Sequence, residues 1–510
     1  MDPRNGLRKA GVKTVPKADC APVLFLRKQV ANFVEHLMNS ALHLFRPIQM
    51  EATAAAPMPL DEDSTRESQR GHDSARGFDR CVLLLSSRQG WNLMNFQKRI
   101  LDSIVLIVAL TATMPCVFAG DWPQFLGPQR NGHSDETGLI DQWPEAGLKV
   151  VFRVPGGVGM SGVSVAGNRV VTLVQDASAQ SVICLDANTG NKIWSTPIAP
   201  AFKNAMGNGP RSAPALTSDQ GFVFTGEGLL AAVDLDSGEK QWEVDVIEEF
   251  GGKPAEYGMA SSPIFHQGLV IVTAGCPNAT VVAFDCKTGE HRWSVGQDRT
   301  GYSSPTLLRV AQQTQLVVYS GTALLGIDPT EGVLLWRYAY ETDYDCNIAM
   351  PINVGDDIFI SSGENHGSLL LSVSKQGTSY EVEERWASQG RKSVMRNEWQ
   401  TSIHLDGVLY GFDNVGSAGP ITHLTCVDAE TGGRKWQESR FGKGNLICAD
   451  GKLLITTMDG EFVMAKASPD GFAEMGRQKL IGMTRQAPSL ANGKIYLRDD
   501  TEIVCLDLRQ

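Results

Sequence analysis

A short pattern that recurs along the chain limits its possible folds more than any other feature. Each copy runs from an aspartate, through a polar turn containing a glycine, to a tryptophan. The copies are residues 186–194, 236–242, 285–293, 328–336 and 428–436. With Trp386 included, successive tryptophans from 194 to 436 lie 43 to 51 residues apart, and a period of this size is typical of a propeller or a solenoid. The chain is therefore expected to be built from repeated units.

The second repeat unit indicates which of these architectures applies. Short apolar stretches cover residues 212–216, 221–225, 229–235 and 240–246, and Gly or Asp-Gly signals separate them. No segment with a helical period lies between these stretches. Four short antiparallel strands in each repeat of this length form one blade of a β-propeller.

The recurring pattern has a mechanical explanation within such a blade. The third strand meets the fourth through a tight hairpin, where Asp186, Asp285 or Asp428 can accept backbone N–H bonds. The glycine of each copy can take the positive φ that such turns require. The tryptophan follows on the outer strand, where it can lie against the next blade and bury roughly 150 to 250 Å².

Counting the units predicts an all-β, eight-bladed propeller. The seventh unit has an outer strand near residues 472–477 that lacks the tryptophan, and the eighth ends at residue 508 without an outer strand. Residues 148–154 resemble an outer strand, with Phe152 in the tryptophan position. A strand from the N-terminal side would close the last sheet and remove both free edges of the ring.

The sequence before the propeller divides into three segments. Residues 1–93 carry no repeat, and we expect them to be disordered or a mis-assigned gene start. Residues 94–119 have a basic start, an apolar centre and small residues before Gly120, which is typical of a signal peptide cleaved after Ala119. An N-terminal membrane anchor is the alternative. Residues 120–147 are expected to be a leader that packs on the propeller, which then covers residues 148–510.

Composition argues against two classes of function. The chain has 46 Lys and Arg against 57 Asp and Glu, a net charge of -11, and nucleic-acid binders need a basic surface instead. Its cysteines form no Cys-x-x-Cys pair, and those at 184, 426 and 505 share one repeat position. We therefore expect buried small hydrophobic side chains rather than metal or redox chemistry.

The mouth of the central channel is the expected ligand site, because the loops entering the innermost strands converge there. The residue three before the proline of these strands is Arg211, Tyr302 or Arg485 in three blades, and Ala260 or Ile348 in two others. Weaker alignments add Met160, Trp399 and Lys443. Three cations with two aromatic rings would suit an anionic or aromatic group, or a peptide segment. The alternative is that one residue per blade fills this position whatever the function.

The pattern resembles a known family. Asp-x-x-Thr-Gly-x-x-x-Trp at residues 186–194, 285–293 and 428–436 is similar to the tryptophan-docking motif of the pyrroloquinoline-quinone (PQQ) repeat propellers. The leader at residues 121–132 is similar to the opening segment of many secreted bacterial members. The family includes quinoprotein alcohol dehydrogenases, BamB, and sensor domains of bacterial Ser/Thr kinases. The resemblance implies a fold and leaves several functions open.

The quinoprotein enzymes of this family use a disulfide between adjacent cysteines, a Ca²⁺ ion and an aspartate base. This chain has no Cys-Cys pair, and no other catalytic motif appears. We therefore expect a secreted or envelope-associated, non-catalytic and monomeric propeller that binds a protein or peptide, with no metal or cofactor. A PQQ- and Ca²⁺-dependent oxidoreductase of alcohols or sugars, and a ligand-sensing propeller, are the alternatives.

Overall fold

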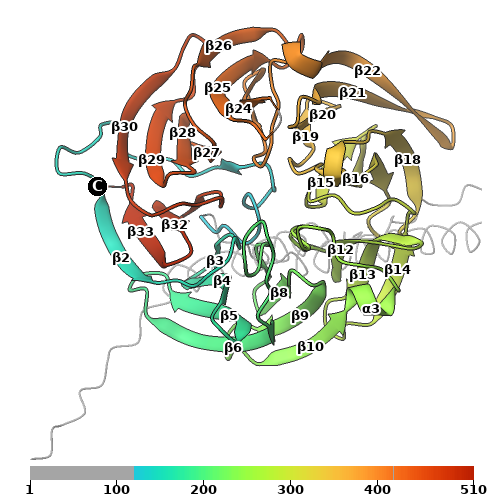
Figure 1. The fold of residues 1–510 in the computed structure, drawn as a ribbon, viewed down its shortest axis with the longest axis horizontal. Coiled ribbons are helices and arrows are strands. Elements are labelled where there is room, and N and C mark those ends of the chain that lie inside the picture. The colour runs from blue at the N-terminus through green and yellow to red at the C-terminus, as the bar shows by residue number, and fades with distance from the viewer. Residues whose placement is uncertain (1–119, 417, 510) are drawn as a thin grey trace, which may run out of the picture. The chain divides into compact units, whose positions relative to one another are not determined.

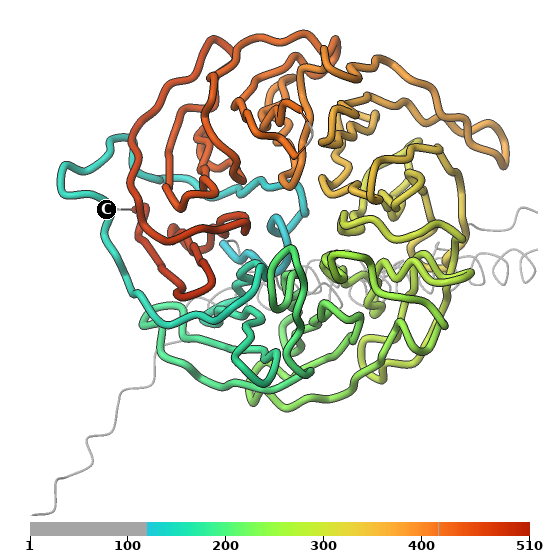
Figure 2. The backbone as a smooth tube through the Cα atoms, viewed as in Figure 1, coloured from blue at the N-terminus to red at the C-terminus, as the bar shows by residue number. Residues whose placement is uncertain are grey.

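A computed structural model describes residues 120–416 and 418–509, all within one compact unit. They form a ring of eight β-sheets around a central axis, as Figures 1 and 2 show. The predicted eight-bladed β-propeller is confirmed. The expected disordered segment, signal peptide and cleavage after Ala119 concern residues 1–119, which lie outside the described residues. No described helix is long and apolar enough to cross a membrane.

The sheets follow one another around the ring, and each contains antiparallel strands numbered from the channel outwards. The first four blades are β3 (Ser164–Ala166), β4 (Arg169–Gln175), β5 (Ala179–Asp186) and β6 (Lys192–Pro200); β7 (Ala215–Leu216), β8 (Gln220–Phe224), β9 (Leu229–Asp234) and β10 (Lys240–Asp245); β11 (Ile264–His266), β12 (Leu269–Cys276), β13 (Ala279–Asp285) and β14 (His291–Val295); and β15 (Thr306–Val310), β16 (Gln313–Tyr319), β17 (Ala323–Ile327) and β18 (Leu334–Ala339).

The last four blades have the same order, with additions from the leader. They are β19 (Ile352–Val354), β20 (Asp357–Ser362), β21 (Gly367–Gln376) and β22 (Ser379–Gln389); β23 (Ile403–Leu405), β24 (Val408–Val415), β25 (Ile421–Asp428) and β26 (Arg434–Glu438); β27 (Gly444–Ala449), β28 (Lys452–Thr457), β29 (Glu461–Lys466) and β30 (Ala473–Lys479), joined by β1 (His133–Ser134); and β31 (Ser489–Ala491), β32 (Lys494–Arg498), β33 (Glu502–Asp507) and β2 (Lys149–Pro155). The short helices are α3 (Val246–Glu249), η1 (Asp343–Asp345) and η2 (Gly390–Lys392).

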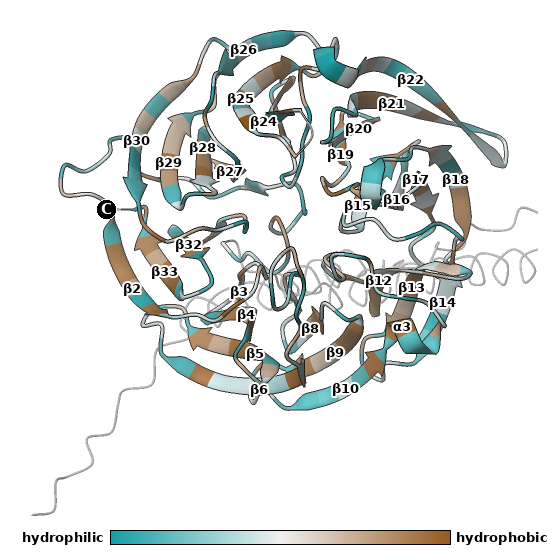
Figure 3. Cartoon of the chain, viewed as in Figure 1, coloured by the Kyte–Doolittle hydropathy of each residue, from teal (hydrophilic) through white to brown (hydrophobic). Residues whose placement is uncertain are grey.

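Burial differs between the middle and outer strands of a blade. All five residues of β8 are buried, whereas the outer strand β10 alternates exposed and half-buried residues. Figure 3 shows the same contrast as apolar colour on β5 and β9 and hydrophilic colour on β10 and β26. Middle strands are covered by blades on both faces, which explains their continuous apolar runs.

Each docked aromatic ring packs on the hairpin glycine of the next blade. In the first blade, the Asp186 carboxylate accepts hydrogen bonds from the backbone N–H groups of Asn188 and Thr189 at 3.0 and 2.9 Å. Gly190 has a φ of 72°, and a Cβ there would lie 2.7 Å from the Phe152 ring. This position thus excludes a side chain both by backbone conformation and by close approach. The other docked pairs are Trp194 with Gly238, Trp242 with Gly289, Trp293 with Gly332 and Trp386 with Gly432.

The second and seventh blades depart from the expected pattern. In the second blade the turn carboxylate belongs to Asp234, which accepts from the backbone N–H groups of Asp236 and Ser237, so this copy begins two residues before the sequence pattern suggested. In the seventh blade, Trp143 of the leader lies against Gly476. The leader therefore supplies the aromatic side chain that the seventh repeat lacks. The sequence analysis did not predict this contact.

The ring is closed at two places by the N-terminal side of the described chain. Strand β2 pairs with β33, as predicted, and Phe152 lies opposite Cys505. Strand β1 runs parallel to β27. The leader also passes through the centre of the ring of blades (Figure 1). There Trp122 forms a β-bridge with Val165, and the Arg130 guanidinium donates to the carbonyls of Ser262 and Pro263. The leader is thus an integral part of the propeller.

Removing the docked ring of the closing strand should destabilise the propeller. Phe152 is 7% exposed, and Phe152→Ala is expected to cost about 3–5 kcal/mol of the free energy of unfolding, because it leaves a cavity beside Gly190. Val150, in the same strand, is 45% exposed, so Val150→Ala should change stability by about 0.5 kcal/mol or less. Urea unfolding followed by tryptophan fluorescence measures both variants. Equal shifts would contradict the docking role.

Candidate functional site

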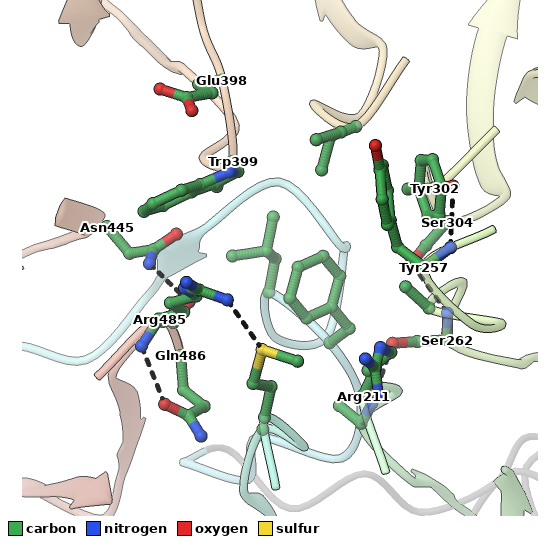
Figure 4. A pocket seen from close by; sticks show the side chains of 18 of the residues that line it. Arg211, Tyr257, Ser262, Tyr302, Ser304, Glu398, Trp399, Asn445, Arg485 and Gln486 are labelled. Carbon is green, nitrogen blue, oxygen red and sulfur yellow. Dashed lines mark hydrogen bonds between the residues drawn. The ribbon is translucent and has the colours of Figure 1, made fainter. Parts of the chain in front are cut away.

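The segments entering the innermost strands converge around a cavity of about 430 Å³ at one mouth of the channel (Figure 4). Of the eight positions predicted to meet here, all but Lys443 line it: Met160, Arg211, Ala260, Tyr302, Ile348, Trp399 and Arg485. The positions meet because equivalent positions of adjacent blades lie at the same height in the ring. Whether a ligand binds there is a separate prediction.

The leader forms an apolar wall of this cavity. Trp122, Phe125 and Leu126 contribute to its lining, and the first and last of these are almost fully buried. These residues were not predicted as part of the site, because no repeat aligns them with the blades. The cavity therefore combines polar side chains from the blade loops with an apolar surface from a segment outside the repeats.

Arg211 is largely occupied by its own loop. Its Nη1 donates to the Gly209 carbonyl at 2.6 Å and its Nη2 to the Gly207 carbonyl at 2.7 Å. The guanidinium carbon lies 4.8 Å from the centre of the Phe202 ring. Burial, and then the nearby charge of Arg485, lower the pKa of Arg211 to about 10. Arg211 remains charged at neutral pH, and its main role is to shape the loop that reaches Met206.

Arg485 has more capacity to bind a ligand. Its Nη1 donates to the Met206 carbonyl at 2.6 Å and approaches the Met160 sulfur at 3.6 Å. Its guanidinium carbon lies 5.1 Å from the centre of the Trp399 ring, within the range of a cation–π contact. Its Nη2 makes no hydrogen bond with any residue that the structure describes. Arg485 can therefore offer this nitrogen to an anionic group.

Lys443 acts at the edge of the site rather than in its lining. Its Nζ lies 4.3 Å from the centre of the Trp399 ring and 2.7 Å from a carboxylate oxygen of Glu398. It also donates to the Ala418 carbonyl at 2.7 Å. The Lys443 charge is thus balanced by Glu398, and this pair supports Trp399 instead of adding a third free cation.

Tyrosines form the opposite side of the cavity, as Figure 4 shows for two of them. The rings of Tyr257 and Tyr302 stack with centroids 5.7 Å apart, and the Tyr302 hydroxyl accepts from the Tyr257 backbone N–H at 3.3 Å. Burial raises the pKa of Tyr302 well above its ordinary value, so this hydroxyl stays protonated. Tyr344 lines the rim and is 67% exposed, on a loop that the Arg299–Asp345 ion pair holds at 2.8 Å.

The side chains of the cavity provide aromatic surface and a cationic donor. Aromatic rings and one guanidinium with donor capacity can hold an apolar group that carries a negative charge. Among the described residues, no group of three or more His, Cys, Asp or Glu side chains could hold a metal ion. Cys346 lines the cavity, whereas the other six cysteines of the described chain are buried.

Comparisons with known proteins agree on the propeller. The family model described as outer membrane protein assembly factor BamB matches residues 178–438. The chain is 21% identical to outer membrane protein assembly factor BamB of Yersinia pestis over 314 residues, which cover 60% of this chain and 76% of that protein.

Two solved structures share the fold. Quinohemoprotein alcohol dehydrogenase from Comamonas testosteroni matches with a TM-score of 0.53 and 14% identity, covering 77% of this chain and 81% of that one. BamB from Moraxella catarrhalis matches with a TM-score of 0.50 and 13% identity, covering 71% of this chain and 99% of that one. An enzyme and an assembly factor thus share this fold, and fold alone does not separate their functions.

The alkylation rate of Cys346 reports on the environment of this thiol in the cavity. Burial, and then the nearby charge of Glu364, raise the pKa of Cys346 to about 11. Because the thiolate is the reactive form, alkylation by iodoacetamide should be slow at pH 8 and rise about tenfold per pH unit until the pH approaches the pKa. Peptide mapping by mass spectrometry at several pH values measures this rate. A rate that is already constant at pH 8 would contradict the predicted environment.

Proposed function

Since the chain belongs to the family of outer membrane protein assembly factor BamB, we propose that it is a non-catalytic propeller of the cell envelope that binds a protein or peptide. The observation that carries this proposal is the cavity at the channel mouth. There Arg485, Trp399 and the stacked tyrosines surround about 430 Å³ beside the apolar leader. This size lies within the range of about 300 to 1,000 Å³ that is common for ligand sites.

A peptide segment matches the chemistry of this cavity. An apolar or aromatic side chain would bury its surface against Phe125 and Trp122, and a carboxylate of the same segment would accept from Arg485. Exposed apolar side chains at the rim, Met206 at 42% and Tyr344 at 67%, would add contact area outside the cavity. Aromatic and arginine side chains are the residues that most often dominate such interfaces.

A PQQ-dependent oxidoreductase is the second candidate. The cations and Trp399 are suited to a planar, negatively charged ring, which favours it. The oxygen donors, however, do not fit the Ca²⁺ ion that accompanies PQQ, because Ca²⁺ takes about 6–8 oxygen ligands. Of the carboxylates lining the cavity, Glu398 pairs with Lys443, and Glu364 accepts from the Ala418 backbone N–H at 2.9 and 3.0 Å. A sensing propeller, the third candidate, would use the same cavity for a small ligand.

Partner capture should depend on the cavity. Purified protein is expected to retain a specific envelope protein in a pull-down from envelope extract, and Arg485→Ala with Trp399→Ala should reduce its recovery at least tenfold, because both the guanidinium and the ring that supports it are lost. Arg292→Ala with Arg309→Ala is the matched control, since both arginines are exposed and lie outside the cavity lining. Equal recovery with the cavity variant would remove the cavity from the proposal.

Quinone chemistry can be tested separately. After incubation with PQQ and Ca²⁺ we expect no dye-linked oxidation of alcohols or sugars, because the carboxylates of the cavity already have partners and Cys346 has no adjacent cysteine. Ca²⁺-dependent dye reduction that disappears in Arg485→Ala would instead establish the oxidoreductase. Absorbance of the dye measures the outcome, with a known quinoprotein dehydrogenase as the positive control.

A further inference from the structure

A second hollow, of about 380 Å³, lies in the sixth blade, away from the channel mouth. It is bounded by the connection from β22 to β23, which includes η2, and by strands β24, β25 and β26. We call it the rim cleft. Its charged and titratable lining consists of Arg391, Lys392, Arg396, Asp413, His423 and Arg434. The set is strongly basic, although the whole chain carries a net charge of -11.

The one carboxylate of the rim cleft is already neutralised. Asp413 forms a bidentate pair with Arg396, at 2.6 Å to Nε and 2.7 Å to Nη2, and both side chains are almost fully buried. Arg391, Lys392 and Arg434 are exposed and form no ion pair with any described residue. Three positive charges therefore stand at the cleft without an ion-pair partner among the described residues.

The side chain of His423 lies among the charged residues of the rim cleft. Its Nδ1 accepts a hydrogen bond from the Arg440 backbone N–H at 3.0 Å. Burial lowers the pKa of His423, and the charges of Arg396, Arg434 and Arg440 lower it further, against the opposing charge of Asp413. Burial is the main cause of the lowered pKa of His423, and the three arginines add to it.

We propose that the rim cleft binds an acidic segment of a polypeptide, through carboxylates that pair with Arg391, Lys392 and Arg434. The inference rests on the proposed function, because it names the chemistry of the partner that the propeller would hold. A volume of about 380 Å³ exceeds the needs of a single carboxylate, so two neighbouring acidic side chains can enter together.

A narrow segment fits this surface better than an anionic membrane. A planar bilayer would face the net charge of -11 and the exposed glutamates on the flanking strands, such as Glu383 and Glu438. Repulsion by these charges acts over about 8 to 10 Å at ordinary ionic strength. A single chain can approach the cations without placing its other charges against those glutamates.

The cleft is connected to the cavity along the chain. The connection that begins with η2 continues to Glu398 and Trp399, which line the cavity. Trp399 lies seven positions after Lys392, so the two residues are no more than about 25 Å apart along an extended backbone. An extended partner segment of similar length could therefore occupy both sites at once.

A labelled acidic peptide tests the rim cleft directly. We expect fluorescein-labelled hexaglutamate to bind the full-length protein, measured by fluorescence anisotropy, and to bind more weakly as salt is added. Arg391→Ala, Lys392→Ala and Arg434→Ala together should weaken binding at least tenfold. The control Lys192→Ala, Lys253→Ala and Lys287→Ala removes the same charge from exposed residues elsewhere and should change binding less than twofold. Equal loss in both variants would overturn the proposal.

Two further probes distinguish the class of ligand. Inorganic phosphate should compete for the peptide only weakly, and vesicles containing phosphatidylglycerol should not bind through these three cations. Tighter binding of either probe, lost in the rim-cleft variant, would overturn the acidic polypeptide as the ligand. If the peptide depends on the cleft but envelope capture fails, only the proposed function falls. If envelope capture succeeds but the rim-cleft variant binds the peptide as tightly as the unchanged protein, only this inference is wrong.

Discussion

Adjacent blades are joined by a repeated contact, in which an aromatic side chain packs on a hairpin glycine of the next blade. Strands within a blade share backbone hydrogen bonds, but adjacent blades meet mainly through side chains. At each docked contact, the glycine lets the aromatic ring of the preceding blade approach its backbone closely. In four blades the indole N–H also donates to a carbonyl of the next blade, at 2.9 to 3.0 Å: Trp194 to Leu235, Trp242 to Cys286, Trp386 to Ala429 and Trp436 to Ser468. The contact thus joins apolar burial to a directional bond.

Hydroxyl groups do comparable work near the channel. The Ala213 backbone N–H donates to Ser262 Oγ at 2.9 Å, and the Ser262 N–H donates to Ser304 Oγ at 2.8 Å. These bonds join the segments entering three consecutive blades, and the three residues also line the cavity. The contacts between blades use the docked aromatic side chains, glycines, backbone atoms and small hydroxyls. The larger side chains of the cavity can therefore differ from blade to blade.

The repeat explains why so much was predictable. A fixed spacing of turns and tryptophans determines the blade, the number of blades follows by counting, and Phe152 in the tryptophan position identifies the closing strand. The cavity positions followed because a proline marks the same height in several inner strands. Other features depend on contacts between distant residues outside the repeat. These include Trp143 on Gly476, the leader beneath the cavity and the pairing of Lys443 with Glu398, which periodicity does not encode.

Positive charge is concentrated at two places on the surface, although the net charge of the chain is negative. Lys443 and Asp413 belong to ion pairs within the fold, so neither adds a free charge to the field near the surface. Arg485 at the cavity, and Arg391, Lys392 and Arg434 at the rim cleft, keep guanidinium or ammonium donors that no described carboxylate neutralises. An acidic chain is therefore repelled at long range by a charge of -11 and attracted only at close approach. The binding proposed at these two places therefore depends on local positive charge rather than on the net charge of the chain.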